Sequence, residues 1–270
     1  MVEACIASRT HYLDITGEIS VFEYVMSRNA EAKAAGVALV PGVGFDVVPT
    51  DTLAAILARA LPDATHLDLA FHTRGGGTSR GTRRTMIEGL GGPGAVRRDG
   101  KIVPVPVAFD VRQIPFSCGS RNAVTIPWGD VSTAYHTTGI PNIRVYVGAS
   151  PRTVNRLRLT TKLAPLLRLG PVRRLLQRVA GPGGPGPEAR AAARVYLWGE
   201  AWNEQGDRRM VTAETPEGYT FTARSAVRAI EWLSEKPPDP GSWTPARIFG
   251  EGFLSQIEGT TVASLDSGSD

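Results

Sequence analysis

The residues with the clearest chemical potential lie in the segment PGVGFDVVPTD, residues 41–51. Gly42 and Gly44 would let the backbone approach a ligand closely, because glycine has no Cβ, and Asp46 and Asp51 would offer hydrogen-bond acceptors or a proton relay. The same segment fits a loop that crosses between domains, with the glycines in turns and Asp51 capping the next helix. Both interpretations stay open for Gly42, Gly44 and Asp46, whereas a helix cap is the preferred one for Asp51.

A second pattern, GTSRG at Gly77–Gly81, matches the GxSxG turn that exposes a nucleophilic serine. Asp110 or Asp130, and then His136, follow in the order found in hydrolases. The downstream strands are predicted to be antiparallel, without the long series of βα units of such enzymes, so a serine hydrolase is only the minor alternative. The arginines around this loop could bind phosphate at a helix start, although a surface loop with solvated side chains is preferred: Arg74, Arg80, Arg83 and Arg84.

The residue types that bind metals show no useful spacing. The four histidines form neither an HxH nor an HExxH pattern, so we expect no metal site, and His11 is expected to pack beside its strand. Cys5 and Cys118 lie far apart and indicate neither a disulfide framework nor a zinc cluster. Low cysteine content, without a signal peptide or a spanning apolar run, predicts a cytoplasmic protein.

The elements around the first loop predict a piece of a parallel sheet. Residues 1–8 are typical of the end of a helix, 11–15 of a short strand, 19–35 of a helix stopped by Gly36, and 37–40 of a fully apolar strand. A strand, a helix and a strand at this spacing form a βαβ unit, whose strands are normally buried in a larger sheet. Two strands cannot make that sheet, so we expect the missing ones upstream of Met1, on another chain, or nowhere. The pattern predicts a chain that begins in the middle of a domain.

The rest of the chain predicts a different architecture. A helix over 52–61 and a strand over 66–73 are followed by a glycine cluster, a helix, and several β-type runs between Gly, Pro and Asn turns, with a hairpin at NEQGD, 203–207. Helical patterns return near the C-terminus. We therefore predict an α/β remnant of a Rossmann domain over 1–49, and an α+β substrate or dimerisation domain with a mostly antiparallel sheet over 50–270.

The charge is unevenly distributed, although the whole chain carries only +4. No Asp or Glu occurs from residue 131 to 187, and a basic insertion is predicted at about 150–187, with leucines at helical spacing, breaks at Pro165 and Pro171, and a linker at 181–187. Such a segment could lie on an anionic membrane surface. Packing of its leucines on the second domain is slightly preferred. Nucleic-acid binding is not expected, because no known module accompanies the charge.

Several separated motifs resemble one family. EACIASRTHYLDITGE, the helix after it, AGVALVPGVGFDVVPTD and GSWTPARIFGEGF are together similar to the saccharopine dehydrogenase-like oxidoreductases, including the trans-acting enoyl reductases of lipid synthesis. The likeness spans nearly the whole chain. Members carry an N-terminal dinucleotide-binding half with a glycine-rich turn, and no such turn follows an early strand here. The resemblance therefore implies a chain that keeps the last βαβ unit of the Rossmann domain and lacks its phosphate-binding part.

The resemblance also implies site residues. In the family, the loops that match DITGE and PGVGFDVVPTD lie at the cleft between the domains, near the nicotinamide of NAD(P). This assigns cleft-lining positions to Thr16, Gly17, Glu18, Gly42, Gly44, Phe45 and Asp46. The catalytic residues stay open, with Asp46 and Asp51 as the candidates.

The function expected from the resemblance is hydride transfer from NAD(P)H to a small-molecule or lipid-linked substrate, in lipid or glycolipid biosynthesis. Without the phosphate loop, this chain is expected to be weakly active or inactive alone. The alternative is a non-catalytic dimerisation or membrane-surface module. In either case we expect a homo-oligomer or a partner that covers the half-sheet, and a protein that is cytoplasmic or peripheral to the plasma membrane.

Overall fold

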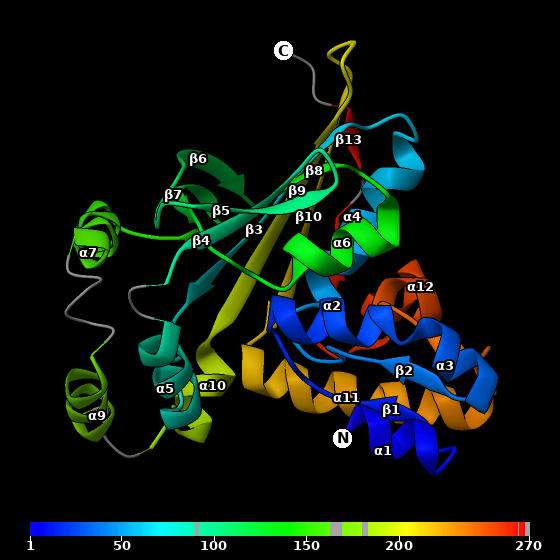
Figure 1. The fold of residues 1–270 in the computed structure, drawn as a ribbon. Coiled ribbons are helices and arrows are strands. Elements are labelled where there is room, and N and C mark those ends of the chain that lie inside the picture. The colour runs from blue at the N-terminus through cyan, green and yellow to red at the C-terminus, as the bar shows by residue number, and fades with distance from the viewer. Residues whose placement is uncertain (90–91, 163–168, 180–182, 264, 268–270) are drawn as a thin grey trace.

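The computed structural model describes residues 1–89, 92–162, 169–179, 183–263 and 265–267, and within them the strands form a small and a large sheet (Figure 1). None of the helices in these ranges combines the length and the apolar composition needed to span a bilayer.

The small sheet consists of three parallel strands in the order β1-β2-β11, with bounds β1 Tyr12–Leu13, β2 Ala38–Val40 and β11 Gly241–Ser242. The parallel pairing of β1 and β2 confirms the predicted βαβ unit. The expectation that every missing strand lies outside the chain is wrong, because β11 comes from the C-terminal part. It is two residues long and follows a proline-rich stretch, so no hydrophobic period marks it in the sequence.

Three helices surround the small sheet: α1 Val2–Ala7, α2 Ile19–Ser27 and α3 Asn29–Ala35. The single helix expected over 19–35 is two helices, which meet at Arg28. Gly36 ends α3 in the left-handed conformation, φ +72°, as its position predicts. Val25, Ala32 and Leu39 are fully buried between helices and sheet and form a separate small core.

The large sheet has ten strands and is mostly antiparallel, as predicted. Its main order is β12-β10-β9-β3-β8-β4-β5. In addition β7 pairs with β8, β6 with β7 and β13 with β10. Among the strands of the described ranges, β3 and β8 are the one parallel pair of this sheet. The hairpin at 203–207 is confirmed. The bounds are β3 His66–Arg74, β4 Gly94–Arg98, β5 Lys101–Val105, β6 Val111–Phe116, β7 Gly119–Thr125, β8 Asn142–Gly148, β9 Arg194–Trp202, β10 Arg208–Pro216, β12 Thr261–Val262 and β13 Asp266–Ser267.

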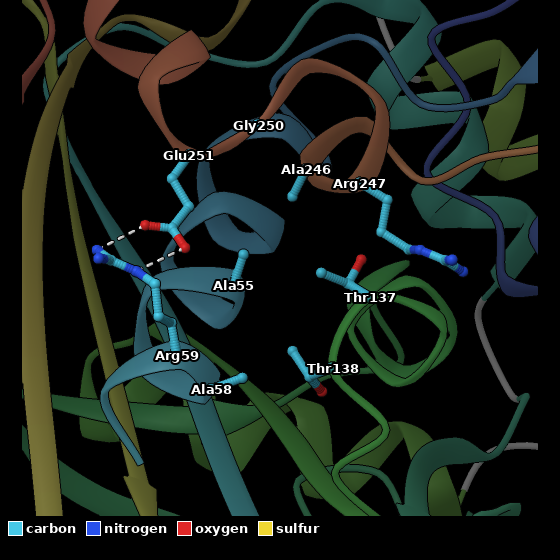
Figure 2. A pocket seen from close by; sticks show the side chains of 9 residues that line it. All are labelled: Ala55, Ala58, Arg59, Thr137, Thr138, Ala246, Arg247, Gly250 and Glu251. Carbon is cyan, nitrogen blue, oxygen red and sulfur yellow. Dashed lines mark hydrogen bonds and ion pairs between the residues drawn. The ribbon is translucent and has the colours of Figure 1, made fainter. Parts of the chain in front are cut away.

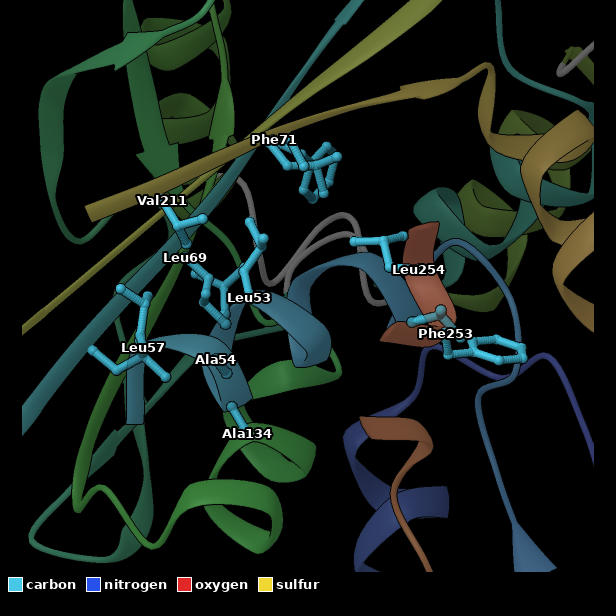
Figure 3. Packing of buried hydrophobic residues seen from close by; sticks show 14 of the residues in the cluster. Leu53, Ala54, Leu57, Leu69, Phe71, Ala134, Val211, Phe253 and Leu254 are labelled. Atoms are coloured by element: carbon cyan, nitrogen blue, oxygen red, sulfur yellow. The ribbon is translucent and has the colours of Figure 1, made fainter. Parts of the chain in front are cut away.

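The main core lies between one face of this sheet and the helices packed on it. These elements are α4 Val48–Ala60, α6 Asp130–Thr138, α11 Gly218–Glu235, α12 Pro245–Phe249 and the 3₁₀ helix Glu251–Gln256. Figure 3 shows Leu53 and Leu57 of α4 beside Leu69 of β3 and Val211 of β10. A Cβ on Gly199 in β9 would lie 2.9 Å from Leu57 Cδ1, so glycine lets α4 sit directly on the sheet.

Of the described helices, α5 Arg80–Gly89, α7 Pro151–Lys162, α9 Gly170–Val179 and α10 Pro187–Ala192 lie on one side of the molecule, at the left of Figure 1. Pro171 lies in the first turn of α9, whereas the break predicted at Pro165 lies outside the described residues. Of the predicted linker, residues 183–186 have no regular structure, and Pro187 begins α10.

Candidate functional site

The structure brings the two predicted loops together at the carboxyl ends of β1 and β2. Asp14 joins them, because its Oδ1 accepts hydrogen bonds from the backbone N–H of Thr16 (3.0 Å) and of Gly42 (2.8 Å). Its backbone oxygen also accepts from Val43 N at 2.8 Å. Asp14 is not among the residues predicted from sequence, although an Asp followed two residues later by a loop Thr is a familiar turn signal.

Asp46 has the most unusual environment of the predicted residues. Its carboxyl packs on the backbone of Gly17, where a Cβ would lie 2.6 Å from Asp46 Oδ2. Burial raises the pKa of Asp46 to about 6. No residue in the described ranges donates a hydrogen bond to this carboxyl. A carboxyl with free acceptor atoms and a pKa near neutral can both take up and release a proton.

The predicted glycines are explained by packing inside the protein. Gly42 has φ +75°, and a Cβ there would lie 2.8 Å from the ring of Phe22. A Cβ on Gly44 would lie 2.9 Å from Thr222 Cγ2 of α11. The space that a side chain would need at these two positions is therefore filled by protein atoms, which favours the turn-and-packing interpretation of the glycines over close approach of a ligand.

An aromatic surface lies beside the loop. The N–H of Phe45 donates to Thr222 Oγ1 at 3.0 Å. The Phe45 ring makes edge contacts with Phe71 and Phe221, with centroids 5.8 and 6.0 Å apart, and Trp128 lies 5.0 Å from Phe71. Phe45 and Trp128 are only partly buried. The loop thus places an apolar wall and a carboxyl in the same neighbourhood.

Asp51 is not the cap of its own helix. It lies inside the first turn of α4, whose N-cap is Val47, and it is fully buried. Its carboxylate accepts from Thr137 Oγ1 at 2.6 Å and from the backbone N–H of Ala246 at 2.9 Å. Asp51 therefore caps α12, which is distant in sequence, and the expected cap of α4 is wrong. Burial raises the pKa of Asp51 to about 6.

A third buried carboxyl, Asp130, belongs to the same group. Its Oδ2 accepts from Thr50 Oγ1 at 2.8 Å. Burial, followed by the negative charges of Asp51 and Asp46, raises the pKa of Asp130 well above its usual range. The sequence pattern suggests Asp130 only as a hydrolase residue, and nothing local to it shows that it is buried near two other carboxyls.

The hydrolase constellation is not assembled. Ser79 Oγ accepts from Thr82 N at 3.1 Å, at the start of α5. His136 Nε2 lies instead 3.4 Å from Glu23 Oε1, and Asp130 is bonded to Thr50. Asp110, the other predicted acid, accepts from Arg144 and Tyr146.

The glycine loop before α5 already bonds within the protein. Ser79 N donates to Tyr219 Oη at 2.7 Å, and Arg83 donates to the carbonyls of Thr78 and Gly183. These contacts occupy donors that a phosphate would need, so they do not favour a phosphate site there.

An open pocket of about 670 Å³ lies elsewhere, between α4, α6 and α12 (Figure 2). Arg59 and Glu251 form an ion pair at one side of it, at 2.8 Å, and Arg247 lies at the other. Thr137 lines the pocket, but its hydroxyl is bonded to Asp51. Because the polar groups that line this pocket pair with each other or with the core, we place the candidate site at Asp46 rather than in the pocket.

The described ranges contain no group of three or more His, Cys, Asp or Glu side chains suited to a metal ion.

The chain shows a likeness to known proteins in its fold and none in its sequence. No family model and no curated protein matches the chain. Among solved structures, it is similar to apo saccharopine dehydrogenase (L-Glu forming) from Saccharomyces cerevisiae, with a TM-score of 0.56 over 97% of this chain and 82% of that one. The sequence identity is 9%, so the likeness shows the fold alone. A small parallel sheet joined to a mostly antiparallel one, as predicted, is the arrangement of the saccharopine dehydrogenase fold.

Proposed function

We propose that this chain is a saccharopine dehydrogenase-like oxidoreductase whose proton-transfer group is Asp46. The observation that carries the proposal is the combination of burial, a pKa near 6 and an unbonded carboxyl at the carboxyl ends of parallel strands. Open α/β sheets bind ligands at that edge. In its protonated form Asp46 would give a proton to the atom that becomes basic as the substrate is reduced.

The family resemblance names NAD(P) as the hydride source, and the residues present fit only part of it. Two loops of the described residues carry glycines between a strand and a helix, and neither is suited to two phosphates: protein atoms fill the space at Gly42 and Gly44 after β2, and the loop 75–79 after β3 is bonded within the protein. The loops after β1 and β2 instead carry the carboxyls of Asp14, Glu18 and Asp46, which would repel phosphate. A nicotinamide ring, which is neutral or positively charged, meets no such obstacle. Because the phosphates do not fit, we derive no reaction step through the dinucleotide.

The aromatic wall supports a substrate with an apolar portion. Phe45 and Trp128 are only partly buried and both contact Phe71, and aromatic surfaces of this kind recognise hydrocarbon groups. An enoyl-type reaction on a lipid-linked substrate, in lipid or glycolipid biosynthesis, agrees with an apolar wall beside a proton donor.

The experiment is a hydride-transfer assay followed by the absorbance of reduced nicotinamide, with α,β-unsaturated carbonyl compounds bearing acyl chains as substrates. We expect Asp46→Asn to lower turnover by about 10²- to 10⁴-fold. Asp99→Asn, at an exposed hairpin turn, removes a charge as a control and should have no effect. Equal activity of Asp46→Asn and wild type would refute the assignment.

The alternative, a non-catalytic dimerisation module, is favoured by one observation. β1 is an edge strand of the small sheet, and Ile15 just beyond it is 57% exposed. Unpaired edges promote association between chains. A chain that dimerises through this edge and shows no hydride transfer with any substrate above would favour that alternative.

A further inference from the structure

The charge of the protein is divided between two regions. Nine of its 30 basic residues and none of its 26 acidic residues lie between 131 and 187, so the remainder has 21 basic and 26 acidic residues, a net charge of −5. Helices α7 and α9 come from this basic region and lie together with α5 at one side of the molecule (Figure 1). A chain of modest net charge therefore concentrates positive charge in the segment that forms α7 and α9.

Helix α7 has two distinct faces. Val154 and Leu157 pack against a small core that includes Ala108 and Val124, which fixes the orientation of the helix. At 100° per residue, Arg152, Arg156 and Leu159 share the opposite face. All three are exposed, and Leu159 keeps 52% of its surface in solvent. Packing on the second domain, the interpretation preferred from sequence, thus explains one face of α7 and leaves the other unexplained.

The exposed arginines of α7 have no partner among the described residues. Within the described ranges no carboxylate or carbonyl contacts Arg152, Arg156 or Arg158, although most arginines of the large sheet are bonded. On α9, Arg174 is exposed, and Leu169 directly before that helix is 52% exposed. Exposed arginine and leucine side chains therefore occur on α7 and around the start of α9, where Arg174 Nε donates to the carbonyl of Gly170 at 3.4 Å.

We propose that the outer face of α7, together with the start of α9, docks on an anionic lipid bilayer. Arginines on such a face are attracted to anionic head groups, and leucines between them can enter the acyl boundary. A nucleic acid would use the arginines but gives no reason for exposed leucines, so the lipid surface explains both residue types. This interaction is independent of the reaction at Asp46.

The test is co-sedimentation of the full chain with vesicles of phosphatidylcholine alone and of phosphatidylcholine with phosphatidylserine. We expect binding only to the anionic vesicles, with weaker binding as salt rises from 0.1 to 1 M, because screening shortens from about 10 to about 3 Å. Arg152→Gln with Arg156→Gln should weaken binding by more than tenfold, since each arginine near the surface contributes about a fivefold change. Leu159→Ser should weaken it without any change in charge.

The matched control is Arg98→Gln with Lys101→Gln, which removes two exposed positive charges from the β4–β5 hairpin. This variant should bind vesicles as wild type does. Circular dichroism establishes that every variant is folded. Three results would overturn the proposal: sedimentation with neutral vesicles, equal loss in the control variant, or no vesicle binding by a chain that binds a single-stranded oligonucleotide.

Discussion

Three carboxyls lie close to the candidate site: Asp51 and Asp130 are fully buried and Asp46 is partly buried, and the negative charges of Asp51 and Asp46 add to burial in raising the pKa of Asp130. Hydroxyls of Thr50 and Thr137 satisfy two of them, while Asp46 keeps free acceptor atoms. The two carboxyls that join helices, Asp51 and Asp130, accept hydrogen bonds from side chains. Asp46, in the loop of the candidate site, accepts none from the described residues.

Asp130→Asn tests the raised pKa of Asp130. Because burial raises the folded-state pKa of Asp130, the folded protein holds a proton there that the unfolded chain loses near pH 4, so stability falls as pH rises above that value. At pH 5 we expect the free energies of unfolding of the variant and of wild type to differ by at most about 1 kcal/mol. Between pH 5 and 8.5 the free energy of unfolding of wild type should fall by about 1 to 3 kcal/mol more than that of the variant. Urea denaturation at both pH values measures it.

In the same experiment Asp99→Asn, at an exposed turn, should follow wild type at both pH values. A parallel loss of stability in Asp130→Asn and wild type would mean that Asp130 does not hold the proton.

The sequence predicts the role of some of these residues and not of others, for physical reasons. Asp46 was found because glycines and an acid after an apolar strand are a local signal. The partner of Asp51 lies 195 positions away, at Ala246, and the neighbours of Asp130 also come from other elements. Contacts between residues so far apart produce no recognisable sequence pattern. The predicted role of Asp51 is therefore wrong, and the burial of Asp130 is not predicted.

At the scale of elements, helices α2 and α6 are joined through Glu23. Its Oε1 accepts from Arg97 at 2.9 Å and from Ser132 at 2.6 Å, and Arg97 is buried against the ring of Tyr135 at 4.1 Å. The interaction with His136, then the hydrogen bond from Ser132 and the charge of Arg97, lower the pKa of Glu23 to about 2. One carboxylate thus connects the small sheet's helix layer to the large sheet.

Glu23→Gln should therefore destabilise the protein in a pH-dependent way. With a folded pKa lowered from 4.5 to about 2, the contribution of Glu23 is present above pH 4.5 and is lost as pH falls through 2. Because Glu23 is 42% exposed, we expect a loss on the order of 1 kcal/mol at pH 7, which shrinks toward zero near pH 2. Glu31→Gln, in an exposed pair with Arg28, is the control and should have a smaller effect. A loss that is constant with pH would contradict the ionic role.

Local sequence patterns predict most of the helices and strands, whereas elements that form only by pairing with distant parts of the chain are not predicted. The strands at 38–40 and 66–74, the hairpin at 203–207 and the long C-terminal helix were recognisable from apolar runs and turn residues. The strand at Gly241–Ser242 was not, because two residues carry no period and its partner β2 is about 200 positions earlier.

At the scale of the whole molecule, the division at residue 49 stays a prediction, as does the homo-oligomer. Gly241–Ser242 joins the small sheet, so the chain returns to its N-terminal part after building the large sheet. Light scattering tests association: we expect dimers through the open edge of β1, and a monodisperse monomer at high concentration would contradict them.

Weak dinucleotide binding is the expectation that follows from the loops of the small sheet. Since the described residues offer carboxyls and no phosphate turn there, NADPH should bind this chain with a Kd of about a millimolar or worse. Titration by nicotinamide fluorescence measures it. Micromolar binding would show that the phosphates are held elsewhere, with the loop at residues 74–81 as the first place to look.

The most direct test of the central claim is the titration of the Asp46 carboxyl carbon by ¹³C NMR, with the signal assigned by its loss in Asp46→Asn. The measurement is made with and without 1-benzyl-1,4-dihydronicotinamide, a reduced nicotinamide that carries no phosphate group and so does not depend on a phosphate site. We predict a pKa of about 6 for the free protein and a shift of that pKa when the nicotinamide compound is added. An ordinary pKa near 4, unchanged by the compound, would contradict the assignment of Asp46 as the proton-transfer group.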